Sequence, residues 1–132
     1  PVTVTTPNGM KVHAIQTGFV AVKEPHREYE GQSNPLLAIV AARQWTEWLP
    51  IYSWVIEHPE GVIVIDAGET YKVYDPDYFG CDPVTRFVHT RQLKFSVTQQ
   101  DEIGPQLLAL GIDPLKDVRC AIQTLIHTDH MG

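Results

Sequence analysis

The chain has 132 residues, which suits one domain or part of a larger one, and its 43% hydrophobic and 20% charged residues are typical of a soluble globular protein. Ten Lys and Arg face sixteen Asp and Glu, a formal net charge of −6, which argues against nucleic acid as a partner. The longest apolar run, residues 36–42, is far shorter than the roughly 20 residues of a membrane span, so we expect no membrane partner and a cytoplasmic protein, although a removed signal peptide would leave no trace.

The first third of the chain predicts a lead-in, a strand and a loop. Residues 1–9 carry a Pro and an Asn-Gly turn signal, and we expect a flexible lead-in. Residues 11–22 alternate in character and predict a strand that is broken at Gly18. Residues 24–35 are rich in turn formers and predict a loop. Residues 36–45 fit a short helix or a strand, and their periodicity does not decide between the two.

The clearest predicted element is a β-hairpin. Two β-rich runs, residues 49–57 and 61–68, are joined by His-Pro-Glu-Gly at residues 58–61. Pro and Gly occupy the positions in which a type I turn favours them. The second run contains four consecutive apolar residues, 62–65, a pattern typical of a strand that is buried on both faces.

Residues 69–97 lack clear periodicity but are rich in aromatic residues. A connection of this length in a compact domain is usually a functional lid or a pocket wall, so we predict a long aromatic loop. Its aromatic side chains could line an acyl-binding pocket or cover the sheet as core, and the sequence favours neither. The candidates for the pocket wall are Tyr71, Tyr78, Phe79 and Phe87.

A helix and a strand are predicted next. Thr98 and Asp101 have the spacing of a helix N-cap, and Gly111 has the character of a helix end. Three apolar residues between them share one helix face: Ile103, Leu107 and Leu110. Pro105 interrupts this pattern, so the helix kinks there or starts late. Residues 117–124 predict a strand.

A compact polar motif follows this strand. His127, Asp129 and His130 lie within four residues, where the end of a strand holds side chains in place. Imidazole nitrogens together with a carboxylate suit zinc or a related divalent ion, and a bound metal makes hydroxide available near neutral pH. A polar loop that caps a following helix through Asp129 explains the same residues, and the motif alone does not separate the two interpretations.

The order of these pieces resembles the N-terminal half of the metallo-β-lactamase superfamily, and within it the N-acyl-homoserine lactonase-like hydrolases. Residues 49–70, "LPIYSWVIEHPEGVIVIDAGET", and 101–132, "DEIGPQLLALGIDPLKDVRCAIQTLIHTDHMG", carry the resemblance, and the first 35 residues match loosely. It implies that residues 1–132 are a partial domain, of mixed α+β or α/β class. This domain would be half of a four-layer αββα sandwich with metals at the sheet edge and its remainder beyond residue 132.

The family motif is His-X-His-X-Asp-His, which implies that His127, Asp129 and His130 are metal ligands and that Asp129 also orients the attacking water. Position 125, where the first His is expected, holds Leu125, which cannot coordinate a metal. One bound ion or two, a natural inactive member, and an engineered or misread position all stay open. Asp66 is implied to support the metal ligands from beneath, and a strand-end cap is its alternative role.

Two functions follow from this resemblance. The first is a hydrolase whose metal-bound hydroxide attacks an ester-like carbonyl, above all that of a lactone such as an N-acyl-homoserine lactone, in quorum quenching. Thioesters and β-lactams are the runner-up substrates. The second is a non-catalytic relic or binding module on the same fold, which Leu125 and the missing half favour. Either way, an exposed sheet face should pair with a complementary C-terminal half or with a second copy.

Overall fold

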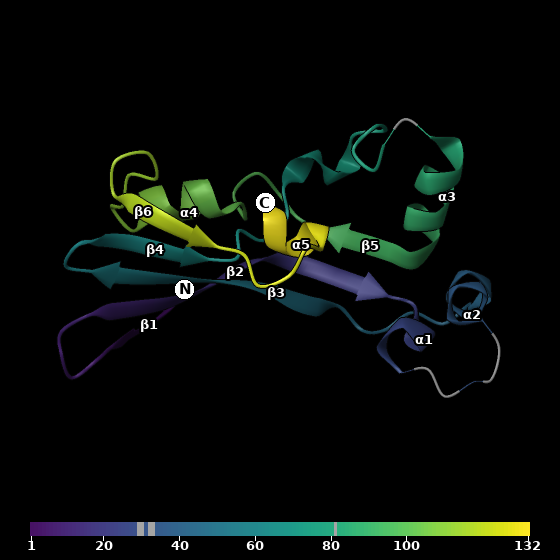
Figure 1. Cartoon of the computed structure of the whole chain (residues 1–132), viewed down its shortest axis with the longest axis horizontal. Helices are drawn as coiled ribbons and strands as arrows, with labels where there is room; N and C mark the ends of the chain where they lie inside the picture. Colours follow the sequence, from purple (N-terminus) through teal and green to yellow (C-terminus); the bar gives the residue numbers. More distant parts are fainter. Residues whose placement is uncertain (29–30, 32–33, 81) are drawn as a thin grey trace. The chain divides into compact units, whose positions relative to one another are not determined.

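The structure, a computed structural model, describes residues 1–28, 31, 34–80 and 82–132. Its helices and strands are shown in Figure 1. In chain order they are β1 (Val2–Thr5), β2 (Lys11–Val22), α1 (Glu24–Arg27), α2 (Pro35–Ala41), β3 (Leu49–His58), β4 (Gly61–Ile65), the 3₁₀ helix η1 (Tyr71–Tyr74), α3 (Pro83–Gln92), β5 (Leu93–Ser96), α4 (Ile103–Ala109), β6 (Val118–Ile122) and α5 (Thr128–Met131). The chain therefore has the mixed α and β content that its sequence predicts.

Two compact units make up the chain. The sheet unit consists of residues 1–18, 50–71 and 97–132, and the aromatic unit consists of residues 19–49 and 72–96. The strands β1, β2, β3, β4 and β6 are neighbours in this order. In the aromatic unit, the end of β2 pairs antiparallel with β5.

The pairing of β4 with its two neighbours positions the polar motif. β3 and β4 form the predicted hairpin, with Trp54 opposite Ile65. β4 and β6 are parallel, with Ile65 opposite Ile122. Because both strands run in the same direction, the residues after Ile65 and after Ile122 reach the same edge of the sheet. Asp66 and the segment with the motif therefore meet, although more than fifty positions separate them in the sequence.

One face of the sheet carries the core of the sheet unit. Alternate residues of β2, β3 and β4 point toward α4 and the turn that follows it. The buried cluster consists of Ile15, Val55, Val62, Val64, Leu107 and Ile112. The predicted apolar face of the helix is thereby confirmed, since Leu107 enters this core while Ile103 and Leu110 pack against it.

On the opposite face of the sheet unit, several large apolar side chains are exposed or half-buried. Val62 and Val64 are buried, but Ile63 and Ile65, which alternate with them, are only half-buried, so the prediction that residues 62–65 are buried on both faces is wrong for the chain by itself. Ile65 lies between Trp54, which is 46% exposed, and Ile122, which is 47% exposed. We call the surface formed by Tyr52, Trp54, Ile63, Ile65 and Ile122 the open face.

Residues 1–9 are not a flexible lead-in. The alternating sequence Val-Thr-Val-Thr forms β1, which pairs antiparallel with β2 from Val2 opposite Ala14 to Thr5 opposite Lys11. The buried His13 ring lies 2.8 Å from the Thr3 hydroxyl through Nδ1. The predicted break at Gly18 is also absent. β2 continues to Val22 because Gly18 adopts a φ of 131°, which glycine tolerates.

The aromatic unit contains helices where loops were predicted. Residues 24–27 form the helical turn α1, and the ambiguous apolar run is the helix α2. Residues 69–97 are not a long loop, because they contain η1, α3 and β5. α3 begins with a polar cap. The Asp82 carboxylate accepts a hydrogen bond from the Thr85 amide at 2.7 Å, and Pro83 occupies the first turn. This Asp-Pro start was the sequence signal that the prediction missed.

The helix after residue 98 starts late, as one of the two predicted alternatives states. The Thr98 amide and hydroxyl both donate to the Asp101 carboxylate at 2.7 Å, but this contact closes the turn that precedes α4. Pro105 then falls in the first turn of α4, where a missing N–H breaks no helical hydrogen bond. Gly111 ends the helix with a φ of 79°, as predicted. No helix in the described part of the chain is long and apolar enough to cross a membrane.

Candidate metal centre

The polar motif is fastened to the end of β4 by its backbone. After β6 ends, the chain passes through residues 123–127 and enters the single turn of α5. Three backbone hydrogen bonds connect this segment to residues 66–68: Asp66 N to Ile122 O at 2.8 Å, Ala67 N to His130 O at 2.9 Å, and Gly132 N to Gly68 O at 2.9 Å. The motif is thus held by main-chain contacts that do not depend on its own side chains.

Close packing at this junction requires glycine. Gly68 has a φ of 79°, and a Cβ placed on it would overlap the buried side chain of Thr17. Gly132 has a φ of 68°, and a Cβ there would come within 2.5 Å of the Ala67 Cβ. Both glycines therefore allow the motif and the end of β4 to approach more closely than side chains permit.

The Asp66 carboxylate is the centre of a hydrogen-bond cluster. It is 8% exposed and lies within hydrogen-bond distance of Thr124 and His130. The three contacts are Thr124 N to Oδ1 at 2.8 Å, Thr124 Oγ1 to Oδ2 at 2.6 Å, and His130 Nδ1 to Oδ2 at 2.9 Å. An ionised carboxylate only accepts hydrogen bonds, so Nδ1 of His130 is the donor, and this arrangement places the lone pair of an uncharged ring on Nε2.

Burial and hydrogen bonding act on the Asp66 carboxyl in opposite directions. Burial works to raise its pKa, but hydrogen bonds from the Thr124 hydroxyl, the Thr124 amide and the His130 ring lower it, and together they prevail. The pKa of Asp66 is therefore below the ordinary value of 3.8. Asp66 is ionised at neutral pH and acts as an acceptor toward His130.

Two of the three predicted ligands are brought together. The Asp129 Oδ2 lies 3.7 Å from the Nε2 of His130, on the side of the ring that Asp66 leaves unused. Both side chains are 27% exposed, so the pair remains accessible from solvent. A neutral imidazole nitrogen beside a carboxylate is a donor set that suits zinc and similar divalent ions.

His127 does not complete a three-ligand cluster with this pair in the described part of the chain. It is exposed and occupies the N-cap position of α5, where its side chain makes no capping hydrogen bond. A helix does follow the motif, but Asp129 lies inside its first turn and is not the cap. Within the described ranges, no group of three or more His, Cys, Asp or Glu side chains is arranged to hold a metal ion. The structure thus brings two of the three predicted ligands close together, and their binding of a metal stays a prediction.

Leu125 and its neighbour are exposed beside the motif. The exposed fraction is 45% for Leu125 and 85% for Ile126, so neither side chain contributes to a core. Thr124, just before them, is a contributor to the site that the sequence analysis missed. A threonine at the end of a predicted strand carries no distinct signal, and only the register of β4 and β6 shows that it faces Asp66.

The predicted pocket residues lie in different settings. Phe79 stacks on His89 with ring centroids 4.7 Å apart, and Tyr78 meets Phe79 edge-on at 5.0 Å, both within the aromatic unit. Phe87 is exposed on α3 and lines a shallow hollow of about 310 Å³. Tyr71 is also exposed and belongs to the sheet unit. That these four residues contact an acyl chain stays a prediction.

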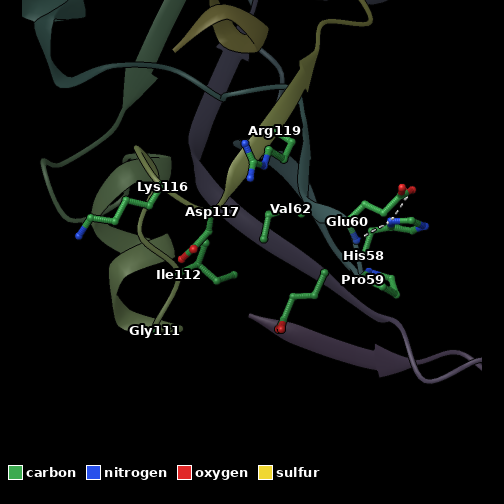
Figure 2. A pocket seen from close by; sticks show the side chains of 11 residues that line it. His58, Pro59, Glu60, Val62, Gly111, Ile112, Lys116, Asp117 and Arg119 are labelled. Carbon is green, nitrogen blue, oxygen red and sulfur yellow. Dashed lines mark hydrogen bonds and ion pairs between the residues drawn. The ribbon is translucent and has the colours of Figure 1, made fainter.

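A second hollow, of about 380 Å³, lies at the other end of β4 and β6 (Figure 2). It is lined by the hairpin turn at His58 and by the start of β6 at Arg119. The Arg119 stem lies over Gly61, where a Cβ would overlap it. Because this hollow surrounds the strand ends away from Asp66, it is separate from the polar motif.

No family model matches the chain. In sequence it is 33% identical over 85 residues to the N-acyl homoserine lactonase AttM of Azorhizobium caulinodans, and 32% identical over 85 residues to that of Agrobacterium fabrum. Each match covers 64% of this chain and 30% of the relative. The chain therefore spans under a third of the length of the curated relatives that it matches.

Solved structures of N-acyl homoserine lactone hydrolases also resemble the chain in fold. One is an N-acyl homoserine lactone hydrolase with the product N-hexanoyl-L-homoserine at its catalytic metal centre, with a TM-score of 0.63 and 21% identity over 90% of this chain and 42% of that chain. Another is a quorum-quenching N-acyl homoserine lactone lactonase, with a TM-score of 0.60 and 19% identity over 98% of this chain and 41% of that chain.

The fold of the chain is part of the metallo-β-lactamase fold. More particularly, it is the form of that fold found in N-acyl homoserine lactone hydrolases, and the chain is also similar to the AttM lactonases in sequence. The predicted resemblance and the predicted fold class are both confirmed.

Proposed function

We propose that this chain carries part of the metal site of a hydrolase that opens N-acyl homoserine lactones. The observation that carries the proposal is the pair formed by His130 and Asp129. The Nε2 of His130 lies 3.7 Å from Asp129, while Asp66 holds the other ring nitrogen at 2.9 Å. Similar proteins are lactonases, and one of them holds a lactone-derived product at a catalytic metal centre. These likenesses support a lactone as the substrate in preference to a thioester or a β-lactam.

Each residue of the motif receives a role in this proposal. His130 and Asp129 hold a divalent ion such as zinc, His127 joins them from the start of α5, and Asp129 also orients the attacking water. Asp66 fixes the ring of His130 from beneath. A divalent ion held by these residues would make hydroxide available near neutral pH and would act as a Lewis acid. Because Leu125 removes one ligand of the first family site, we expect one ion more readily than two.

The non-catalytic alternative receives no support from the comparisons, since the relatives reported above are lactonases or hydrolases. Leu125 is the only feature of the motif that favours it. A quorum-quenching role follows for this chain if it opens the same lactones. A cytoplasmic location stays a prediction from the sequence.

We further propose that a complementary C-terminal portion covers the open face. This face exposes Tyr52 and Trp54 side by side with half-buried isoleucines, and contiguous apolar surfaces of this kind mark interaction sites. Two sheets stack by interdigitating such faces. The solved chains that share this fold are more than twice as long as the part matched, so they contain enough further chain to form a second layer.

An assay of N-hexanoyl-L-homoserine lactone opening in the presence of Zn²⁺ tests the proposed activity. Proton release measures the rate of ring opening. We expect the protein that combines this chain with the proposed C-terminal portion to open this lactone faster than a thioester or a cephalosporin, and we expect Asp129→Ala and His130→Ala to abolish the reaction. Lactone opening that is equally fast in these variants, or absent while Zn²⁺ is bound, would contradict the proposal.

A further inference from the structure

We infer that Thr124 is a positioning residue, whose hydroxyl and amide fix the Asp66 carboxylate so that it accepts the hydrogen bond from Nδ1 of His130 and leaves Nε2 facing Asp129. The inference rests on the proposed function in one respect, that Nε2 is the nitrogen that binds the ion. Thr124 itself need not touch metal or substrate.

Thr124 contacts both oxygens of the carboxylate. Its amide donates to Oδ1 at 2.8 Å and its hydroxyl donates to Oδ2 at 2.6 Å. Oδ2 also accepts from Nδ1 of His130 at 2.9 Å. Two donors from one residue on two different oxygens prevent the carboxylate from rotating about its Cβ–Cγ bond. The oxygen that faces His130 is thereby kept in place.

The hydroxyl of Thr124 donates its hydrogen bond to one acceptor. The Thr124 Oγ1 lies 3.4 Å from Nδ1 of His130, at the limit of hydrogen bonding, but only 2.6 Å from Oδ2. The hydroxyl therefore donates to the carboxylate and does not compete with it for the imidazole proton. Without this hydroxyl, Oδ2 keeps only its contact with His130, and the side chain of Asp66 gains rotational freedom.

The backbone at Asp66 points to the same constraint. Asp66 has a φ of 57°, and it is the only described residue other than glycine with a positive φ. A conformation of this kind is strained for a residue other than glycine and persists only where the surroundings enforce it. The amide of Asp66 donates to Ile122 O at 2.8 Å, and its carboxylate accepts from Thr124. Both the backbone and the side chain of Asp66 are therefore held by residues at or just after the end of β6.

Long-range ¹H–¹⁵N NMR of the histidine rings tests this inference in the metal-free protein. We expect His130 to carry its proton on Nδ1, and we expect Thr124→Val, which keeps the shape but loses the hydroxyl, to shift the ring toward the tautomer protonated on Nε2. Thr124→Ser keeps the hydroxyl and should keep the tautomer. If Thr124→Val does not fold, Thr124→Ala replaces it, since serine and alanine differ at this position by the hydroxyl alone.

Zn²⁺ titration calorimetry on the same variants gives the second readout. Residues that orient a ligand change metal affinity by about 10–100-fold when they are replaced. We expect a loss of about 10-fold in Thr124→Val and wild-type affinity in Thr124→Ser. A wild-type His130 protonated on Nε2, or an unchanged tautomer in the hydroxyl-free variant, would overturn the inference. Because the NMR measurement needs neither metal nor lactone, failure of the proposed activity would leave this outcome readable.

Discussion

At the scale of single residues, Leu125 has the most direct chemical consequence. It stands where the family motif has a histidine, and its side chain is 45% exposed beside the motif. We predict that Leu125→His adds a nitrogen ligand and raises Zn²⁺ affinity or stoichiometry in titration calorimetry. Ile126→His is the matched control, because it adds a histidine one position away on an exposed site. Equal gains in Zn²⁺ binding by both variants would contradict the prediction, because an imidazole at either position would then have the same effect.

The glycine beneath the motif gives a second prediction at this scale. Gly68 and Gly111 share a φ of 79°, but a Cβ on Gly68 would overlap Thr17 while a Cβ on Gly111 would meet nothing within 4 Å. Gly68→Ala should therefore lower the free energy of unfolding by about 1–3 kcal/mol more than Gly111→Ala does, because only the first adds a steric overlap. Urea denaturation measures both, and equal losses would contradict the close packing described here.

At the scale of elements, a hydrogen-bond chain joins β1, β2 and β3. The buried His13 lies 2.8 Å from Thr3 through Nδ1 and 2.8 Å from Glu57 through Nε2, and Lys11 lies 3.5 Å from the same carboxylate. The hydrogen bond from His13 is the main cause that lowers the pKa of Glu57 below 4.5, against a smaller effect of burial and with the help of the Lys11 charge.

A pH dependence follows from this shift. Because the pKa of Glu57 is lower in the folded state, its ionised form stabilises the fold at pH values above 4.5, and this contribution is lost as the pH falls through the lowered pKa. Wild type should exceed Glu57→Gln in melting temperature at pH 7, and the difference should shrink at pH values below 4.5. If the difference in melting temperature between wild type and Glu57→Gln stays constant from pH 7 to pH 3, ionisation of Glu57 is not its cause.

The elements that could be predicted are those with strong local patterns. The hairpin of β3 and β4, the apolar face of α4 and its glycine end all follow from apolar periodicity and turn residues. β1 and α3 were missed for different reasons. β1 is four residues long and gains its stability from pairing with β2. α3 presents no buried residue, so its helix is indicated by the Asp82 cap and the Pro83 that follows it.

At the scale of the whole molecule, topology decides which site residues meet. The sequence identified Asp66, Asp129 and His130, but only the parallel register of β4 and β6 brings the first against the last. The same register reveals Thr124, which no motif marks. His127 shows the opposite case, since proximity in the sequence predicts a shared site, while no cluster of three possible ligands forms within the described residues.

The open face gives the prediction that belongs to the whole chain. Without a second layer, Tyr52 and Trp54 remain in solvent, so we predict that the 132-residue chain self-associates in sedimentation velocity. Trp54→Glu should reduce the association by placing a charge in the centre of the face. Leu108→Glu is the control, because Leu108 is exposed on α4, which packs against the other face of the sheet. A monomeric wild-type chain would contradict the assignment of the open face as an interaction surface.

The central claim is that Asp129 and His130, oriented by Asp66, bind a divalent ion, and Co²⁺ titration followed by visible absorption tests it most directly. We expect about one ion per chain, with binding lost in Asp129→Ala and in His130→Ala. His58→Ala, at the hairpin turn away from Asp66, should bind as the wild type does. Absence of binding, or binding that is unchanged in both motif variants, would contradict the account.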